Sequence, residues 1–507
     1  MTDRPDRLPR RPFAHSAVLL AGSDLLGRAV LFLISPLLTR LLTPAQYGSY
    51  ALLLSVAAVL ALVQYGGMDA AFPFFRARAA DHQAEERIVV TASVVVTASA
   101  LVIALVACIV AAVTPPLRRL AQLSTTEMLI FCAALFPMAM SGWHQYVFRY
   151  LRETGRFVRV TLLSQVGGPL IAVPLMTLVR QEQRLMAFLL VILLAQAAAA
   201  LWALGQYAGM HLRMYRRVAF SGALAKEMLH YGLRLVPAFL LYAASFHAGR
   251  WLLAWFDGAA SVSALAIAAL LSSAALIIRA WFSFFWDPYV AHWIAVDPPS
   301  VYLPRMQAAV PLVASVLFAL TAVAVVWADV VIRILYPPSY LGAAKLVPFL
   351  LCAATCSALS AVAISTVLIG NTPRFHLPLY AAALIIDVAA CLVLVPSRGA
   401  LGAAWANFAT ELFILASWIA VGWFVLRNLR IGWTAALFQL TVAVLLAAVY
   451  QPGALWSEHV LAERCIVTLL AVGIIAGAGA WALREQWPQV SRMISTRGVP
   501  APLAATE

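Results

Sequence analysis

The sequence predicts an all-α polytopic membrane protein with about fourteen transmembrane helices. Of its 507 residues, 64% are hydrophobic and 11% are charged, whereas an average soluble domain carries about 45–50% apolar and about 25% charged residues. The apolar residues form runs of about 20, which is the length that crosses a bilayer as a helix. The Lys and Arg residues gather in the short segments between these runs. This composition excludes a soluble core, a disordered chain and a disulfide scaffold.

Each apolar run is a candidate span. The first one follows the basic segment from Arg4 to Arg11 and lacks a small-residue cleavage site, so we interpret it as an uncleaved span rather than a signal peptide. The weakest candidate is the fourth, which contains Trp143, His144 and Gln145. The candidate spans are 13–38, 47–68, 88–113, 128–150, 158–179, 185–207, 231–255, 261–285, 308–328, 346–369, 376–396, 400–426, 433–450 and 465–483.

The distribution of basic residues predicts the orientation. With the N-terminus inside, and with Arg149 and Arg159 at span ends counted to that side, the cytoplasmic side holds 22 of the 35 Lys and Arg residues. The opposite side holds 9, and 4 lie within spans. Cytoplasmic loops carry the excess of positive charge in membrane proteins. We therefore expect both termini to be cytoplasmic.

A weak internal repeat predicts two lobes. Pro73 closes the second span and Pro288 closes the eighth, and the residues that open these spans show the same offset of 215. Such repeats are typical of transporters, which bind substrate between two halves. We expect two six-helix lobes around a central cavity, followed by two further helices as an appendage. The corresponding boundaries are 1–12 (tail), 13–207 (first lobe), 208–230 (cytoplasmic linker), 231–426 (second lobe), 433–483 (last two spans) and 484–507 (tail).

The connecting segments are too short for a catalytic domain. None exceeds about 23 residues, and the chain contains no GxxxxGK[ST], HExxH, GxSxG or DxD pattern. The six cysteines lie inside apolar runs without a CxxC pair, which favours small buried residues over a metal site. The sequence therefore predicts neither an enzyme nor a bound metal or cofactor.

Charges near the middle of a span are costly and need a partner, a hydrated cavity or a function. Asp24 and Arg28 lie one turn apart in the first span and share a helix face. They can be a structural ion pair, or they can line a cavity in which Arg28 binds an anion.

Two carboxylates form a second candidate. Asp387 and Glu411 fall near the centres of the eleventh and twelfth spans, which a turn of about four residues joins. If they lie close together, one of them should have a raised pKa and could carry a coupling H+. A Na+ site that includes Asn407 is a second interpretation, and separate hydrogen bonds to nearby groups are the structural alternative.

Two further arginines lie five or six residues from the ends of their spans. Arg279 can extend to the lipid headgroups, because long cationic side chains do so readily. Arg250 is similarly placed in the seventh span. Both stay candidates for binding an anionic substrate.

Three segments resemble the polysaccharide flippases of the Wzx type, within the multidrug/oligosaccharidyl-lipid/polysaccharide (MOP) exporter superfamily. The segment 38–48, LTRLLTPAQYG, is similar to the TRxLxPxxYG turn after the first helix of these proteins. The segment 231–237, YGLRLVP, resembles the entry to their second lobe, and 395–405, VPSRGALGAAW, resembles the turn between their last two core helices. Order and spacing agree over about residues 13–426, although fourteen spans are the number found in lipid II flippases.

This resemblance implies a flippase of the bacterial inner membrane for undecaprenyl-pyrophosphate-linked oligosaccharides in O-antigen (lipopolysaccharide), capsule or exopolysaccharide synthesis. The substrate-binding residues would be Arg28, held by Asp24, with Arg250 and Arg279. The coupling ion would be H+ or Na+. Besides membrane lipids, the implied partners are a polysaccharide polymerase and the chain-length machinery, and no nucleic acid is expected. The alternatives are a lipid II-type flippase, a cation-coupled multidrug antiporter of the same superfamily and, as an enzyme, a membrane polysaccharide polymerase or ligase.

Overall fold

The computed structural model is helical throughout the regular elements of the part of the chain that it describes. The chain forms two compact units, Met1–Ala266 and Ile267–Glu507. The described residues are 22, 27, 29–30, 32–76, 78–114, 122–151, 153–215, 220–273, 275–276, 299–368, 375–425, 433–449 and 458–484.

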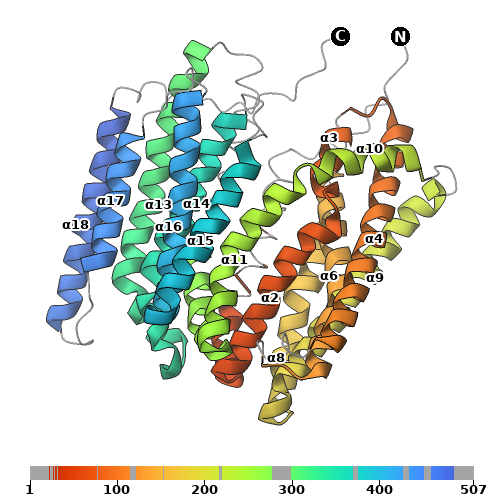
Figure 1. The fold of residues 1–507 in the computed structure, drawn as a ribbon, viewed down its shortest axis with the longest axis horizontal. Helices are drawn as coiled ribbons and strands as arrows, with labels where there is room; N and C mark the ends of the chain where they lie inside the picture. The colour runs from red at the N-terminus through yellow and green to blue at the C-terminus, as the bar shows by residue number, and fades with distance from the viewer. Residues whose placement is uncertain are drawn as a thin grey trace. The chain divides into compact units, whose positions relative to one another are not determined.

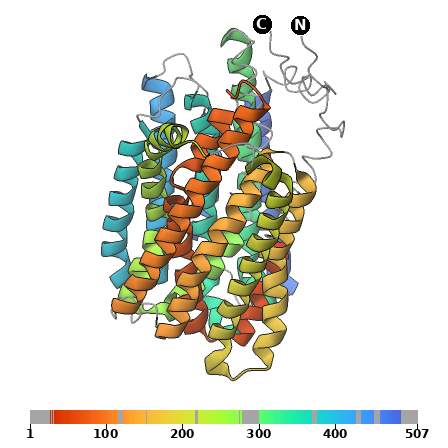
Figure 2. The same ribbon diagram turned by 90° about the vertical axis from the view of Figure 1, so that its right-hand side faces the viewer.

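The first unit is a bundle of long helices joined by short ones (Figures 1 and 2). Its long helices run roughly along one direction in both views, whereas α10 lies across their ends (Figures 1 and 2). The elements are α2 (Pro44–Tyr65), α3 (Met68–Arg76), α4 (His82–Val113), α6 (Thr125–Tyr150), α7 (Thr154–Thr161), the π-helix η1 (Leu162–Gly167), α8 (Gly168–Thr177), the 3-10 turn η2 (Gln181–Gln183), α9 (Arg184–Tyr215), α10 (Gly222–Leu233) and α11 (Val236–Asp257).

Local sequence signals explain where these helices begin and end. Thr43 caps α2 through a reciprocal pair of bonds with Gln46, and Pro44 occupies the first helical position, where its missing N–H is not needed. The helix ends at Gly66 and Gly67, whose φ values of 57° and 77° suit glycine. The TRxLxPxxYG segment thus forms a helix start.

The core of the first unit lies among α3, α4, α6, α9 and α10. Trp143 is 1% exposed, and its indole N–H donates to Ser93 Oγ at 3.0 Å. Phe72 is fully buried and meets the Trp143 ring edge-on at 5.9 Å. Met228 of α10 is also fully buried in this core, so part of the expected linker is a helix packed on the first unit.

The second unit contains the remaining long helices. They are α13 (Pro299–Leu335), the 3-10 segment η3 (Pro338–Lys345), α14 (Val347–Leu368), α15 (His376–Arg398), α16 (Ala400–Ala420), the π-helix η5 (Val421–Val425), α17 (Thr434–Val449) and α18 (Glu458–Leu483). The VPSRGALGAAW segment forms the turn between α15 and α16, with Gly399 at φ 54°. A Cβ at Gly402 would lie 2.3 Å from Leu394 O, so this glycine permits close packing of the two helices.

The last two helices are bound into the second unit by polar contacts. Arg464 of α18 pairs with Asp329 of α13 through two hydrogen bonds of 2.7 and 2.9 Å. The amide of Gln439 on α17 donates to Ser315 Oγ on α13 and to Ile475 O on α18, both at 2.8 Å. The predicted appendage is therefore built into the helix packing of this unit.

The structure confirms the predicted fold class, an all-helical membrane protein. Ten helices in the described residues are long and apolar enough to cross a membrane. Shorter apolar helices at Phe32–Leu41, Ala259–Ser273 and Thr434–Ala447 coincide with the first, eighth and thirteenth predicted spans, and α11 coincides with the seventh. The total of fourteen, like the pair of six-helix lobes around a cavity, stays a prediction. Both α10 and α11 belong to the first compact unit.

Candidate functional site

The residues that end the TRxLxPxxYG segment lie against α11. Helix α2 runs beside α11 within the first unit (Figure 1). A Cβ at Gly48 would lie 1.7 Å from the backbone O of Ala259, just beyond the end of α11. Only glycine therefore permits this approach of α2 to the end of α11. About two turns further along α2, Ser55 Oγ accepts a 2.8 Å hydrogen bond from the Trp251 indole on α11.

The half-buried Arg250 lies on α11 in this α2–α11 seam. Its Nη1 lies 3.3 Å from His247 Nδ1, and the phenol of Tyr47 on α2 lies near the guanidinium. Because a guanidinium can only donate, Nδ1 must accept and His247 is neutral, with its proton on Nε2. Within the described residues, no carboxylate lies within ion-pair distance of Arg250. The seam therefore holds a cation whose charge the described part of the protein leaves unbalanced.

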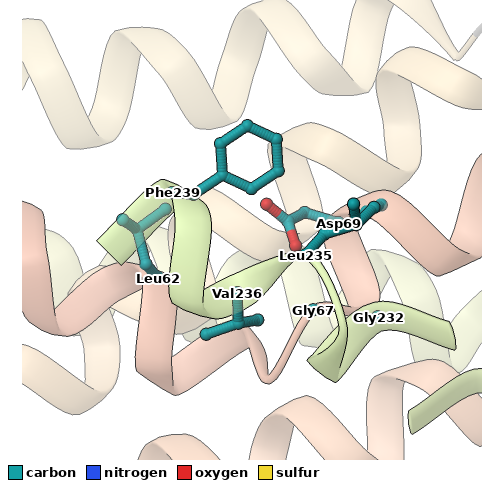
Figure 3. Close-up of a pocket in the computed structure, with 8 residues that line it drawn as sticks. Leu62, Gly67, Asp69, Gly232, Leu235, Val236 and Phe239 are labelled. Carbon is teal, nitrogen blue, oxygen red and sulfur yellow. The ribbon is translucent and has the colours of Figure 1, made fainter. Parts of the chain in front are cut away.

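At the other end of α2, the backbone of the α2–α3 turn crosses that of the α10–α11 junction (Figure 3). A Cβ at Gly67 would lie 2.4 Å from Gly232 C, and a Cβ at Gly232 would lie 2.3 Å from Gly67 O. The carboxylate of Asp69 lies beside this crossing and lines a cavity of about 10 Å³, room for roughly one water. Burial raises the pKa of Asp69 above its usual range. Close backbone contacts at glycines therefore lie at both ends of the α2–α11 seam.

The second unit holds the two predicted carboxylates near the middle of α15 and α16. Asp387 is fully buried, and its Oδ1 accepts from Thr410 Oγ1 at 3.2 Å, while Oδ2 has no hydrogen-bond partner among the described residues. Glu411, 2% exposed, lies near the thiol of Cys356 on α14. Asn407 is half-buried and shares a helix face with Thr410 and Glu411. Thr410 thus connects Asp387 to α16, whereas Glu411, the next residue, lies towards α14.

The outcome differs among the residues predicted from the sequence. Asp387, Glu411 and Asn407 lie on the neighbouring helices α15 and α16, and Arg250 lies in the α2–α11 seam. Asp24, Arg28 and Arg279 lie outside the described residues. The binding and coupling roles of all seven stay predictions. No group of three or more His, Cys, Asp and Glu in the described residues could hold a metal ion.

Sequence reasoning missed two polar features. Asp329 and Arg464 were assigned to connecting segments because each lies one residue outside a predicted span; the longer helices bring them together. A cluster of glutamines around the π-helix η1 was missed because isolated amides in apolar runs give no pattern. Their only signal was that each interrupts a span.

Several solved structures share this fold. The lipid II flippase MurJ in an inward closed conformation has a TM-score of 0.64 at 11% identity, covering 93% of this chain and 100% of that one. An inward-facing MATE-family multidrug resistance transporter of the MOP superfamily has a TM-score of 0.57 at 12% identity, with coverages of 86% and 100%. A Vibrio cholerae MATE transporter mutant has a TM-score of 0.50 at 13% identity, with coverages of 82% and 94%.

No curated protein sequence matches the chain. The solved structures are transporters and flippases rather than enzymes, in agreement with the sequence analysis. The model of one family, described as polysaccharide biosynthesis protein, matches residues 13–289. This match covers more than half of the chain and includes the TRxLxPxxYG segment, α2, α11 and Arg250. The chain therefore belongs to the polysaccharide biosynthesis protein family, with the fold of the MOP superfamily.

Proposed function

We propose that the protein is a flippase that moves undecaprenyl-pyrophosphate-linked oligosaccharide repeat units across the bacterial inner membrane by alternating access. The family and the fold support transport of a lipid-linked precursor in polysaccharide synthesis. The product would be an O-antigen, a capsule or an exopolysaccharide. Both termini would be cytoplasmic, and a polymerase with its chain-length machinery would receive the product outside.

The observation that carries this proposal is the unbalanced cation in the α2–α11 seam. Arg250 is held by His247 and lies near Tyr47, and both are uncharged in this arrangement. Arginine keeps its charge at all physiological pH values and binds phosphate oxygens through two parallel N–H groups. A seam built in this way favours a pyrophosphate and disfavours a cationic drug, which argues against the multidrug antiporter.

The proposed path separates the two parts of the substrate. The pyrophosphate and sugars would occupy a hydrated cationic cavity, with Arg28 as the principal ligand, Asp24 holding it, and Arg250 and Arg279 assisting. The polyprenyl tail would stay in lipid, because its transfer into a polar cavity is unfavourable. Since the sequence has no phosphate-binding loop for ATP, the energy would come from an ion gradient. The carboxylates Asp387 and Glu411, with Asn407, would carry the coupling H+ or Na+.

A lipid II-type flippase is the second candidate. The structural likeness to MurJ favours it, since this likeness extends over 93% of the chain. Lipid II also carries a pyrophosphate, so the arginine argument applies to both substrates equally. Only the sugar part distinguishes them.

A complementation experiment tests the proposed function. The chain should restore surface polysaccharide in a strain that lacks its polysaccharide flippase, and Arg250→Gln should reduce this restoration although the variant reaches the membrane in normal amount. Arg234→Gln, at an exposed position near the start of α11, is the matched control and should restore fully. Restoration of growth in a strain depleted of its lipid II flippase, without restored polysaccharide, would favour the second candidate. Failure of the unaltered chain in both strains would reject both functions.

A further inference from the structure

Three glutamines from three membrane helices meet at the π-helix η1 in the first unit. Gln145 of α6 donates to Ser164 Oγ at 2.9 Å, and Gln165 donates to Gln145 Oε1 at 3.5 Å. Gln196 of α9 donates to the backbone O of Ser164 at 3.1 Å and accepts from Ser141 Oγ at 2.6 Å. We call these five residues the amide cluster. It connects α6, η1 and α9, which adjoin one another in the first unit.

The π-helix creates this arrangement. Its wider turn interrupts the regular i→i−4 bonding, and such segments are frequently found at functional sites. Here the backbone O of Ser164 accepts a side-chain bond from Gln196. The cluster also reaches the first span, because a Cβ at Gly27 would lie 2.2 Å from Gln165 Oε1. Gly27 directly precedes Arg28, the proposed pyrophosphate ligand.

The depth of the amide cluster in the membrane determines what can surround the exposed part of its side chains. Gln165 is the twelfth residue of the 24-residue span Thr154–Thr177, and Gln196 lies well inside the span Gln181–Gln206. Gln145, Gln165 and Gln196 are only half-buried by protein. An amide that faces hydrocarbon loses its hydrogen bonds to water without replacement, which is strongly unfavourable. The exposed side of the cluster therefore requires a hydrated space or a polar ligand.

We propose that the amide cluster is the subsite that binds the sugar hydroxyls of the substrate; this assignment rests on the proposed flippase function. The five side chains offer neutral donors and acceptors together. Sugar hydroxyls also donate and accept, so amides match them in both directions. A pyrophosphate needs cationic ligands and a bound metal ion prefers carboxylates, and the hydrogen-bonded groups of the cluster are neither. The cluster approaches the first span at Gly27, and Arg28, the residue proposed for the pyrophosphate, is the next residue in the sequence.

A double variant removes two of the three amides of the subsite while keeping the packing. Gln145→Leu with Gln165→Leu replaces both bonded partners by apolar groups of similar size, a change that leaves neither amide unpaired. Ser164 Oγ keeps its 2.8 Å bond to Val160 O. The matched control is Gln206→Leu, the same change at a half-buried glutamine ten residues after Gln196 on α9.

Binding of two probes to the purified proteins separates the possible outcomes. One probe is undecaprenyl pyrophosphate without sugar; the other is the lipid-linked repeat unit extracted from a flippase-deficient strain in which it accumulates. The unaltered protein should bind the sugar-bearing probe at least about tenfold more tightly. The double variant should lose this preference and bind the sugar-free probe unchanged, and Gln206→Leu should retain it.

Three results would overturn the assignment, and they have different meanings. Equal binding of both probes by the unaltered protein would reject a sugar subsite but leave the flippase function standing. Equal loss of both probes in the double variant would show that the cluster is structural. If the unaltered protein binds neither probe, the proposed function fails and the subsite fails with it.

Discussion

The guanidinium of Arg464 on α18 and the carboxylate of Asp329 on α13 form a bidentate ion pair inside the second unit, with N···O distances of 2.7 and 2.9 Å. Arg464 is 1% exposed and Asp329 is 7% exposed, and Nη1 of the arginine also donates to Val326 O at 3.0 Å. Parallel bonds of this kind fix both distance and orientation. The pair therefore sets the register of α18 on α13.

Replacement of Asp329 by Leu should destabilise the protein strongly. The variant would leave the Arg464 charge buried beside an apolar group, and breaking a buried pair from one side typically costs about 3–5 kcal/mol. The second change, Arg464→Met, should restore most of the loss, because an apolar pair of similar volume replaces a desolvated ion pair at little cost. The apparent Tm of the detergent-solubilised protein measures both effects.

The partly exposed pair of Glu153 and Arg156, 3.6 Å apart, provides the control. Glu153→Gln should change the Tm little, since exposed ion pairs contribute about 0–1 kcal/mol. A Tm of Asp329→Leu equal to that of the unaltered protein would show that α18 does not depend on this pair.

This pair also shows what the sequence could and could not predict. Apolar runs of about 20 residues located the helices because a bilayer demands that length. The ends of the helices were less certain, because a charged residue at the edge of an apolar run is assigned to a loop. Asp329 lies only one residue beyond the predicted span 308–328, but α13 continues to Leu335. Which charge pairs with which is set by packing between helices far apart in the chain.

The close backbone crossing at Gly67 and Gly232 predicts that a side chain at Gly232 is not tolerated. Gly232→Ala should lower the Tm and reduce transport, because its Cβ would lie 2.3 Å from the backbone O of Gly67, and overpacking typically costs about 1–3 kcal/mol. Gly222→Ala, at the start of the same helix α10, is the control. Its nearest neighbour is the Phe220 ring at 3.9 Å, and alanine favours helix, so this variant should be neutral or slightly more stable. Equal Tm values for the two variants would contradict the close crossing.

The position of Asp69 beside this crossing predicts a pH dependence of stability. Burial raises the pKa of Asp69 in the folded protein, so the folded state favours the protonated form. The contribution to stability is complete below the usual Asp pKa of about 4 and is lost as the pH rises through the raised value. Asp69→Asn should therefore raise the Tm at pH 8 and leave it unchanged near pH 4. Glu227→Gln on the exposed side of α10 should change neither, and a Tm gain of Asp69→Asn at low pH alone would refute the sign.

The carboxylate site in the second unit predicts a change in coupling. Asp387→Asn should fold almost normally, since an amide oxygen can still accept the bond from Thr410 Oγ1. It should remove the dependence of transport on an imposed H+ or Na+ gradient, because a neutral amide can neither be protonated nor balance a cation. Glu411→Gln tests the neighbouring carboxylate in the same way, and Asp257→Asn, exposed at the end of α11, is the control. If Asp387→Asn and Glu411→Gln both keep the full gradient dependence in proteoliposomes, coupling resides elsewhere.

The functional residues were predictable only in part. Charges in the middle of a span stand out in a sequence, so Arg250, Asp387 and Glu411 could be named as candidates. The residues that surround these candidates could not be predicted from the sequence. The contacts of Arg250 with His247 follow from one helix turn, but Tyr47 reaches it only because Gly48 lets α2 approach the end of α11. A Tyr-Gly pair in the first turn of a helix gives no sign of which distant helix it will meet.

Arg250 and Tyr47 give the most direct prediction about the substrate. Arg250→Gln should weaken binding of undecaprenyl pyrophosphate by about tenfold or more, since a hydrogen bond to a charged group contributes about 1.5–3 kcal/mol. Arg250→Lys should fall between, because it keeps the charge and loses the two-pronged geometry. Tyr47→Phe should weaken binding a few-fold with an unchanged Tm, because only the phenol oxygen near the guanidinium is removed. One result would contradict this prediction: none of the three changes affects binding, although Gly48→Ala still disrupts the helix contact. The seam would then be structural, and the pyrophosphate would bind at other arginines.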